Sequence, residues 1–411
     1  MTIKPDVTET NIKPYITKMK VTVKAAILMK ALFIPFKLFK KMAKGGDAAY
    51  TTVLLEFDDG NLYCYSTDGN INAKSTYGPV DDCSDAFYLV DFDSLNSVVT
   101  HSYSEDVVLD FQEARLVIKD QKSIYQFQYF ISAYMPHKSL FDMTATRERK
   151  PIVNFTSAEF SEIIQFLDPN INKDVARMHL TGVKYYKGKF LASNGSTLFG
   201  CVSYNTSETE TFVAKNSLDL ITAIDALNNC EVYERGSVIE VTSERATILM
   251  PQVEDKDLFK HIEVLEKVNF DYSYVFDRVR IYKALKKIQP FADSIFRNRA
   301  YIILNTEGYI EIHVETDKSR SGVDEVPFLD TSTPSADMIE RVLPINVLAD
   351  SIGAMCSDTI SINIPSKDST KISVTDESGR AHYLGVQVKT IQLGTEAPQA
   401  KIKAPLTRKI I

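Results

Sequence analysis

The sequence is poor in the features that would place it in a membrane or outside the cell. Nowhere do about 18 apolar residues follow one another, so no membrane-spanning helix is expected. The opening residues, MTIKPDVTET, lack the apolar core and the small-residue cleavage site of a secretory signal. Tryptophan is also absent, which by itself indicates nothing about function.

Cysteine and histidine are few and scattered. The five cysteines (Cys64, Cys83, Cys201, Cys230 and Cys356) show no metal-ligand or redox spacing, and their number is odd. The simplest interpretation is a reduced, cytoplasmic protein with buried free thiols. The six histidines are dispersed, and none lies at metal-ligand spacing from another histidine or a cysteine. We therefore expect no metal and no cofactor.

Catalytic motifs are absent as well. Gly45-Gly46 is not followed by the Gly-Lys-Ser/Thr of a phosphate-binding loop. The acidic pairs Asp58-Asp59 and Asp81-Asp82 are typical of turns and surfaces. The sequence favours a protein that is not an enzyme. A DNA-processing enzyme built on dispersed carboxylates stays open as an alternative, because sequence alone does not show which carboxylates converge in space.

Positive charge is concentrated near the start of a chain that is acidic overall. The net charge is −7, which is not typical of a nucleic-acid-binding protein. From Asn11 to Gly46, however, there are nine lysines and no acidic residue. A protein that is acidic outside and basic on one surface would have this distribution.

A hairpin pattern occurs three times. The stretches Leu55–Gly69, Leu180–Gly195 and Ala300–Lys318 each alternate apolar and polar residues on both sides of a glycine-containing turn. Their closing residues, Asp68, Asn194 and Asp317, are 126 and then 123 residues apart. The repeat is therefore the size of a domain.

Helical patterns keep the same spacing. Three precede the hairpins, at 24–44, 157–167 and 276–288, and three follow them, at 92–99, 217–227 and 347–355. The segments 107–118 and 237–250 read as strands. We predict an α+β chain of three tandem copies of one domain, each ordered helix, hairpin, helix, strands. Three unrelated α+β domains with similar hairpins remain the alternative.

Two of the helices that precede a hairpin have a basic face. On a helical wheel these cations lie opposite Leu28, Leu32, Ile281 and Leu285. The predicted DNA-binding residues are Lys24, Lys30, Lys37, Lys41, Lys44, Arg280, Lys283, Lys286 and Lys287. Such lysines neutralise phosphates without reading bases. Pro35 is expected to kink or divide the first helix.

Other interpretations of these helices stay open. A solvated lysine face is common, and Phe33, Phe36 and Phe39 would also suit a helix lying on a membrane surface. The corresponding helix of the second repeat, 157–167, contains Glu159 and Glu162 and no lysine or arginine. A basic lining would therefore be uneven.

Beyond these patterns, the sequence resembles the bacterial DNA polymerase III beta sliding clamp. The segment KDVARMHLTGVKYYKGKFLASNGSTLFGC (173–201) resembles that family's middle domain, where a valine-arginine-leucine-glycine run precedes a hairpin that ends in Thr-Asp-Gly-His-Arg-Leu. TFVAKNSLDLITAID (211–225) resembles its following helix, and AHYLGVQVK (381–389) its final strand. The resemblance covers about residues 20 to 390 and is diffuse in the first domain.

The resemblance implies a head-to-tail homodimer, a six-domain ring with helices lining the hole and antiparallel sheets outside. Its domains would be residues 20–148, 149–268 and 269–390, with an N-terminal extension 1–19 and a C-terminal tail 391–411. It implies a processivity factor on double-stranded DNA whose partners are a polymerase, a clamp loader and other peptide-motif proteins, in the cytoplasm, or the host cytoplasm for a viral chain.

The family also implies a peptide pocket between the second and third domains. Carried onto this chain, it would consist of Arg177, Leu180, Ser193, Gly195, Leu198, Phe259, Val264, Val347, Leu384 and Val386. The chain departs from the family at Ser196-Thr197, which replaces His-Arg, at 386–388, which replaces Met-Pro-Met, and at Phe259, which replaces a proline. The family's DNA-contacting arginine falls near Gly46-Asp47. These departures predict a different peptide preference.

The ring seam would join the first domain of one chain to the third domain of the other. The candidate interface residues are Tyr125 and Phe127, on an expected edge strand, and Phe291, after the third repeat's helix. Ordinary core packing is the alternative for these aromatics.

Overall fold

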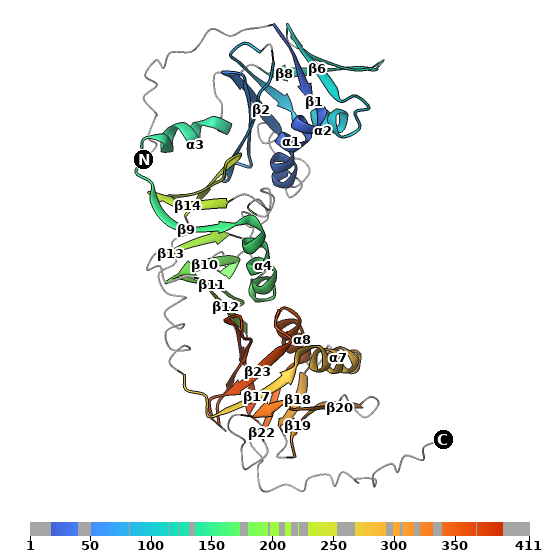
Figure 1. Ribbon diagram of the computed structural model, residues 1–411, viewed down its shortest axis with the longest axis vertical. Coiled ribbons are helices and arrows are strands. Elements are labelled where there is room, and N and C mark those ends of the chain that lie inside the picture. The colour runs from blue at the N-terminus through green and yellow to red at the C-terminus, as the bar shows by residue number, and fades with distance from the viewer. Residues whose placement is uncertain are drawn as a thin grey trace, which may run out of the picture.

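The chain forms an arc of three similar units in a computed structural model (Figure 1). The structure describes residues 18–39, 51–81, 83–113, 115–121, 123–130, 136–172, 180–195, 198–204, 210–214, 221, 229–252, 268–292, 299–304, 307–315, 321–331, 339–366 and 368–388. Helices α1, α2, α4, α7 and α8 lie along the concave side, and the strands form the convex side. The predicted α+β architecture with three tandem copies is confirmed.

The first unit contains ten elements and is followed by a connecting helix. They are β1 (Met19–Lys24), α1 (Ala25–Phe39), β2 (Thr52–Asp58), β3 (Asn61–Thr67), β4 (Asn72–Tyr77), β5 (Ala86–Asp91), α2 (Phe92–Thr100), β6 (Asp106–Gln112), β7 (Arg115–Asp120), β8 (Ser123–Phe130) and the connecting α3 (Pro136–Ala145).

The second and third units repeat this order. The second has β9 (Lys150–Thr156), α4 (Ser157–Leu167), η2 (Asp168–Asn170), β10 (Gly182–Tyr186), β11 (Lys189–Ser193), β12 (Leu198–Ser203), β13 (Glu210–Ala214), β14 (Asn229–Arg235), β15 (Val238–Thr242) and β16 (Ala246–Pro251). The third has β17 (Tyr272–Asp277), α7 (Arg278–Ile288), η4 (Gln289–Phe291), β18 (Arg299–Leu304), β19 (Tyr309–Glu315), β20 (Ser321–Pro327), β21 (Asp330–Thr331), β22 (Ile339–Pro344), α8 (Ile345–Gly353), β23 (Thr359–Ile364), β24 (Lys371–Thr375), β25 (Arg380–Gly385) and β26 (Gln387–Val388).

Local sequence explains the three hairpins. The turn residues Asp59, Gly60, Lys187 and Gly188 have φ values of 48°, 72°, 45° and 76°, and Gly308 has a φ of 93°. Left-handed residues match the twist of two-residue hairpin turns, which is why glycine is found in each of them. The predicted hairpins are confirmed within these bounds.

The helices also agree with their sequence patterns, apart from the first one. α4 has the predicted bounds and begins with a capping box between Thr156 and Glu159. α1 begins one residue after Lys24 and ends at Phe39, and it continues through Pro35 as one helix. The expectation that proline divides this helix is therefore wrong. The predicted helix 217–227 lies outside the described residues except for Ile221, which is helical and buried.

Strand pairing joins the units to one another. Within the first unit the strands form two sets of four, β1-β6-β7-β8 and β5-β2-β3-β4, and the other units repeat this arrangement. β4 of the first unit pairs with β16 of the second, and β12 of the second pairs with β25 of the third. The third unit leaves β20, its counterpart of β4 and β12, at the end of a sheet. The arc is thus continuous through two equivalent joints.

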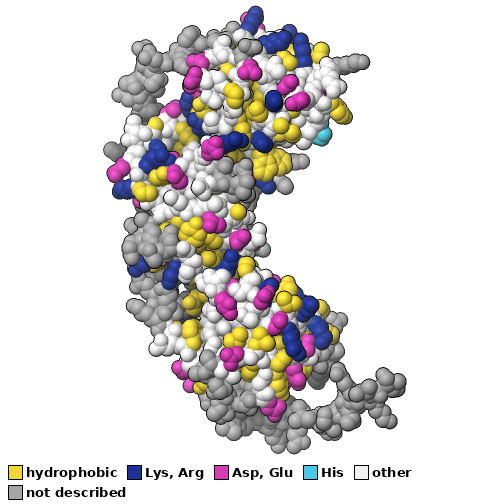
Figure 2. All heavy atoms as spheres, in the orientation of Figure 1, with side chains coloured by type: hydrophobic (Ala, Val, Ile, Leu, Met, Phe, Trp, Pro, Cys, Tyr) yellow, Lys and Arg dark blue, Asp and Glu magenta, His cyan; other side chains and the backbone are white. Residues whose placement is uncertain are grey.

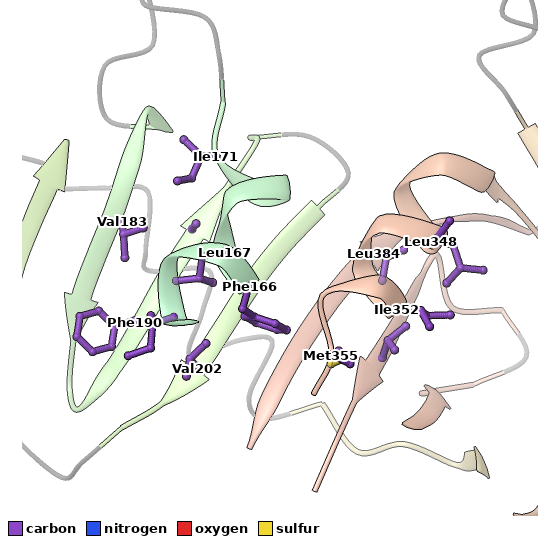
Figure 3. Packing of buried hydrophobic residues seen from close by; sticks show 14 of the residues in the cluster. Phe166, Leu167, Ile171, Val183, Phe190, Val202, Leu348, Ile352, Met355 and Leu384 are labelled. Atoms are coloured by element: carbon purple, nitrogen blue, oxygen red, sulfur yellow. The ribbon is translucent and has the colours of Figure 1, made fainter. Parts of the chain in front are cut away.

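Apolar side chains close these joints beneath the paired strands. Ile34 and Leu38 of α1 belong to the hydrophobic cluster of the second unit. Across the second joint, Phe166 and Leu167 of α4 lie toward Leu348, Ile352 and Leu384 of the third unit, in one continuous cluster (Figure 3). In both joints the helix after the first strand of one unit supplies apolar residues to the next.

The connecting helix α3 lies on the convex side, over β3 and β4. Lys138 of α3 forms a 2.6 Å ion pair with Glu56, and the ring of Phe141 packs edge-on against Tyr65. Beyond α3, Arg149 binds Glu240 at 2.7 Å, and Arg235 binds the carbonyl oxygen of Thr144 at 2.7 Å. These contacts tie the first two units together outside their sheet joint.

Candidate nucleic-acid interface and docking sites

The basic face predicted for the third unit's helix is present on the concave side. Ile281 and Leu285 are buried in the core, whereas Arg280, Lys283 and Lys287 are exposed. Figure 2 shows Lys and Arg side chains gathered along this border of the third unit. The neighbouring acids compensate part of this charge, because Lys287 lies 3.1 Å from Asp324 and, on its other side, Lys286 lies 3.5 Å from Asp350.

The first unit carries less of the predicted positive charge. Lys30 and Lys37 lie on the outward face of α1, as expected. Lys24 does not belong to that helix: it ends β1 and lies 3.8 Å from Glu105, with both side chains exposed. Lys24 is placed there because the chain stays extended up to Ala25. Lys41 and Lys44 lie outside the described residues.

The acidic residues of α4 have structural partners. Glu159 accepts hydrogen bonds from the backbone N–H and hydroxyl of Thr156, and these bonds lower the pKa of its carboxyl group. Glu162 lies 3.6 Å from Arg380 of the third unit, across the second joint. The unevenness expected from the sequence is therefore present, and one of these acids serves the joint.

The residues proposed for the peptide pocket gather around this second joint. Leu198 of β12 pairs with Leu384 of β25. Ser193 accepts a 3.0 Å hydrogen bond from the N–H of Gly195, which is exposed and has a φ of 78°. Val347 of α8 is partly buried against the shared core. Arg177, Phe259 and Val264 lie outside the described residues.

Several of these apolar residues belong to the core of the joint. Leu180 is 3% exposed, Leu384 1% and Val386 6%. The sequence suggests that a charge at Leu180 or Leu384 would abolish partner binding and spare the ring. Their burial makes that separation wrong, because an unpaired charge buried there would also destabilise the joint. Ser193, Gly195 and Val347 are the accessible part of this group.

His382, which the sequence analysis did not single out, lies in the centre of the second joint. Its Nδ1 donates a 3.2 Å hydrogen bond to Oδ1 of Asn170, and its ring lies 4.2 Å from the ring of Phe166. Gly200, which pairs with His382, allows this approach, because a Cβ there would lie 2.5 Å from the Asn170 amide nitrogen. A single histidine in an alternating strand gives no signal of this role.

Burial lowers the pKa of His382 to about 3, and the joint should therefore weaken in acid. The unfolded chain binds a proton near pH 6.5, so stability is lost as pH falls below that value toward the folded pKa. At pH 5 the loss is about 2 kcal/mol. Urea unfolding of wild type and His382→Gln at pH 7 and pH 5 measures it. The wild-type difference should exceed that of the variant by about this amount; equal differences would contradict the assignment.

The aromatic residues proposed for the seam lie at the two ends of the arc. β8 pairs with β7 along its length, but with β5 only at Tyr129 and Phe130, so residues 123–128 have one strand neighbour among the described strands. Tyr125 on this edge is 40% exposed, and Phe127 is half-buried. Phe291 is 41% exposed and sits beside Gly322 of β20.

Chemical centres are not assembled in the part of the chain that the structure describes. No group of three or more His, Cys, Asp or Glu side chains there could hold a metal ion. Of the five thiols, Cys64, Cys201 and Cys230 are buried, as expected, whereas Cys356 is exposed, contrary to expectation, in the turn after α8. No described helix is long and apolar enough to cross a membrane.

A triplicated α+β unit with concave helices and joined convex sheets defines the fold of the DNA sliding clamps. Similar solved structures include the DNA polymerase III beta subunit from Thermotoga maritima (17% identity, TM-score 0.74, covering 90% of this chain and 100% of that one). The Bacillus subtilis DNA polymerase sliding clamp has 11% identity and a TM-score of 0.77 over 90% of this chain and 100% of its own. The Pseudomonas aeruginosa clamp bound to griselimycin has 15% identity and a TM-score of 0.75 over 90% and 99%. No family model and no curated protein matches the sequence.

Proposed function

We propose that this chain is a DNA sliding clamp, a processivity factor that encircles duplex DNA and tethers a replicative polymerase without itself catalysing a reaction. The observation that carries the proposal is the arrangement of joints. Two equivalent joints close the arc internally, and the strands that would form a third, β8 and β20, lie at its opposite ends. The units are taken as residues 20–148, 149–268 and 269–390.

Two chains arranged head to tail would complete both open joints and make a ring of six units. Edge strands are templates for pairing with another chain, and β8 and β20 occupy the positions that pair within the chain at β16 with β4 and at β25 with β12. Closed symmetry then gives a homodimer and not a fibre.

Equivalent positions in the joints support the choice of seam residues. Leu38, Asn170 and Phe291 each lie 13 residues after the first residue of α1, α4 or α7. Leu38 packs into the next unit's core, and Asn170 hydrogen-bonds to His382 of the next unit. Phe291 would accordingly contact the partner's β8. Following the pairing through β1, β6 and β7, Tyr125 corresponds to Ile248 and His382, which receive such contacts.

In the ring, DNA would pass along the concave helices. Arg280 and Lys283 supply charge that is suited to phosphates and independent of base sequence, which a sliding contact requires. The polymerase, a clamp loader and other proteins would bind through short peptides at the second joint, near Ser193, Gly195 and Val347. These surfaces act by binding alone, and the proposed site of action is the cytoplasm.

The mass of the purified protein and its retention on DNA test the proposal. Light scattering should give about twice 46.3 kDa. Protein loaded onto nicked circular DNA by a clamp loader should remain through high-salt gel filtration and be lost when the circle is cut, because a ring slides off an end. A monomer that never stays on circular DNA, or equal retention on linear DNA, would refute encirclement.

A further inference from the structure

The helix α1 differs from its counterparts on the concave side. α1, α4 and α7 each follow the first strand of their unit, so residues at equal distances from the helix start occupy equivalent places. The ninth residue is Phe33 in α1, Gln165 in α4 and Lys286 in α7. Phe33 is 44% exposed, which makes α1 the one of these three helices with an aromatic ring at that place.

Around Phe33, α1 presents what we call the α1 stripe: Met29, Lys30, Phe33 and Lys37. Met29 is also 44% exposed, and the Lys37 ammonium lies 5.2 Å from the centre of the Phe33 ring. The four positions share one helix face, because they are three or four residues apart. Figure 2 shows a hydrophobic area on this concave border of the first unit.

The packing of α1 does not account for this stripe. Leu28, Ala31 and Leu32 fill the core of the first unit, and Ile34 and Leu38 fill the first joint. Phe39, also expected in the apolar set, packs on Phe92 at 4.9 Å between ring centres. The stripe is therefore additional to the residues that the fold and the joint use.

Charge selects the occupant of the stripe. Lysines lie one turn before and one turn after Phe33, and α1 contains no acidic residue, so an anionic ligand is favoured. An aromatic ring flanked by lysines is the arrangement with which proteins bind single-stranded nucleic acid, through base stacking and phosphate contacts. A paired base within a duplex is already stacked on its neighbours and does not offer its face.

We propose that the α1 stripe binds unpaired bases of single-stranded DNA, with Phe33 as the stacking residue and Lys30 and Lys37 as the phosphate contacts. This inference rests on the proposed function for the position of DNA on the concave side. It adds to that function a preference for DNA with a single-stranded segment, such as a primer-template junction.

The absence of tryptophan provides a direct test. Phe33→Trp places one indole in the protein, and stacking on bases quenches indole fluorescence. Titration with oligothymidylate should produce saturable quenching, whereas blunt duplex at equal nucleotide concentration should produce little. Met143→Trp is the matched control, because Met143 is 61% exposed on α3 of the convex side, and it should show only weak, non-saturating quenching. Equal quenching of both variants would overturn the proposal.

A second variant separates stacking from charge. Phe33→Lys gives α1 the residue type found at this place in α7, and it should weaken oligothymidylate binding about tenfold in spite of the added charge. Unchanged or tighter binding would overturn the stacking role. A blue shift of the Phe33→Trp emission with phosphatidylserine vesicles, without quenching by oligothymidylate, would assign the stripe to a membrane surface.

The outcomes remain distinct from those of the ring experiment. Retention on nicked circular DNA is measured on the same preparations. Retention without oligothymidylate quenching would remove the α1 stripe proposal and leave the clamp. Quenching without retention would leave a single-strand binding site on a protein that does not encircle DNA.

Discussion

Replacing Phe291 with aspartate is expected to convert the dimer to a monomer. Phe291 is 41% exposed at one end of the arc, so the substitution removes little from the folded chain itself. In the proposed seam the same carboxylate would be buried without a partner, against the edge that carries Tyr125. Loss of a central aromatic contact costs about 2 kcal/mol or more, which is at least about thirtyfold in the dissociation constant. Analytical ultracentrifugation across a dilution series measures that constant.

Matched variants show whether the effect belongs to the seam. Tyr125→Asp should dissociate the dimer in the same way, because Tyr125 lies on the opposite partner edge. Met143→Asp introduces the same charge at a side chain 61% exposed on α3 and should leave the mass at twice 46.3 kDa. The melting temperature of the monomeric variant at high dilution should match that of diluted wild type. A dimer that persists in both seam variants would move the interface elsewhere.

The repeat was predictable because its signals are local. Alternating strands around Gly60, Gly188 and Gly308 need left-handed turns, and those residues adopt them. The buried faces of α4 and α7 follow the helical period of their apolar residues. Fold class and repeat order could thus be inferred without any long-range information.

The joints were not predictable, because they depend on contacts between distant residues. His382 and Asn170 are 212 positions apart, and no local pattern links them. Leu384 matches a pocket residue of the sliding-clamp family, yet its burial places it in the core of the joint. Lys24 appeared helical because lysines recur at helical spacing beyond it, whereas β1 pairing keeps it extended. Charge compensation at Lys287 by Asp324 likewise required the packing of α7 against β20.

The same compensation determines which basic residues should matter most for DNA. Arg280 and Lys283 are exposed on α7, whereas Lys286 and Lys287 face acidic neighbours. The double variant Arg280→Glu and Lys283→Glu in each protomer should therefore weaken DNA association more than Lys286→Glu and Lys287→Glu together. Each lost phosphate contact lowers the slope of log affinity against log salt by about 1.

The affinity for a short duplex, measured by fluorescence anisotropy at several salt concentrations, gives that slope. For two contacts per protomer the slope should fall by about 2 for each α7 helix that touches the duplex, and the affinity should fall with it for every base sequence tested. Lys371→Glu combined with Lys150→Glu makes the same change in net charge at exposed residues of β24 and β9 and should have a much smaller effect. If this control pair weakens binding as much as the α7 pair, then total charge governs association and the concave helices have no special role. If only the α7 pair acts, and does so while the mass remains dimeric, then phosphate contacts made on the concave side hold the duplex within the ring.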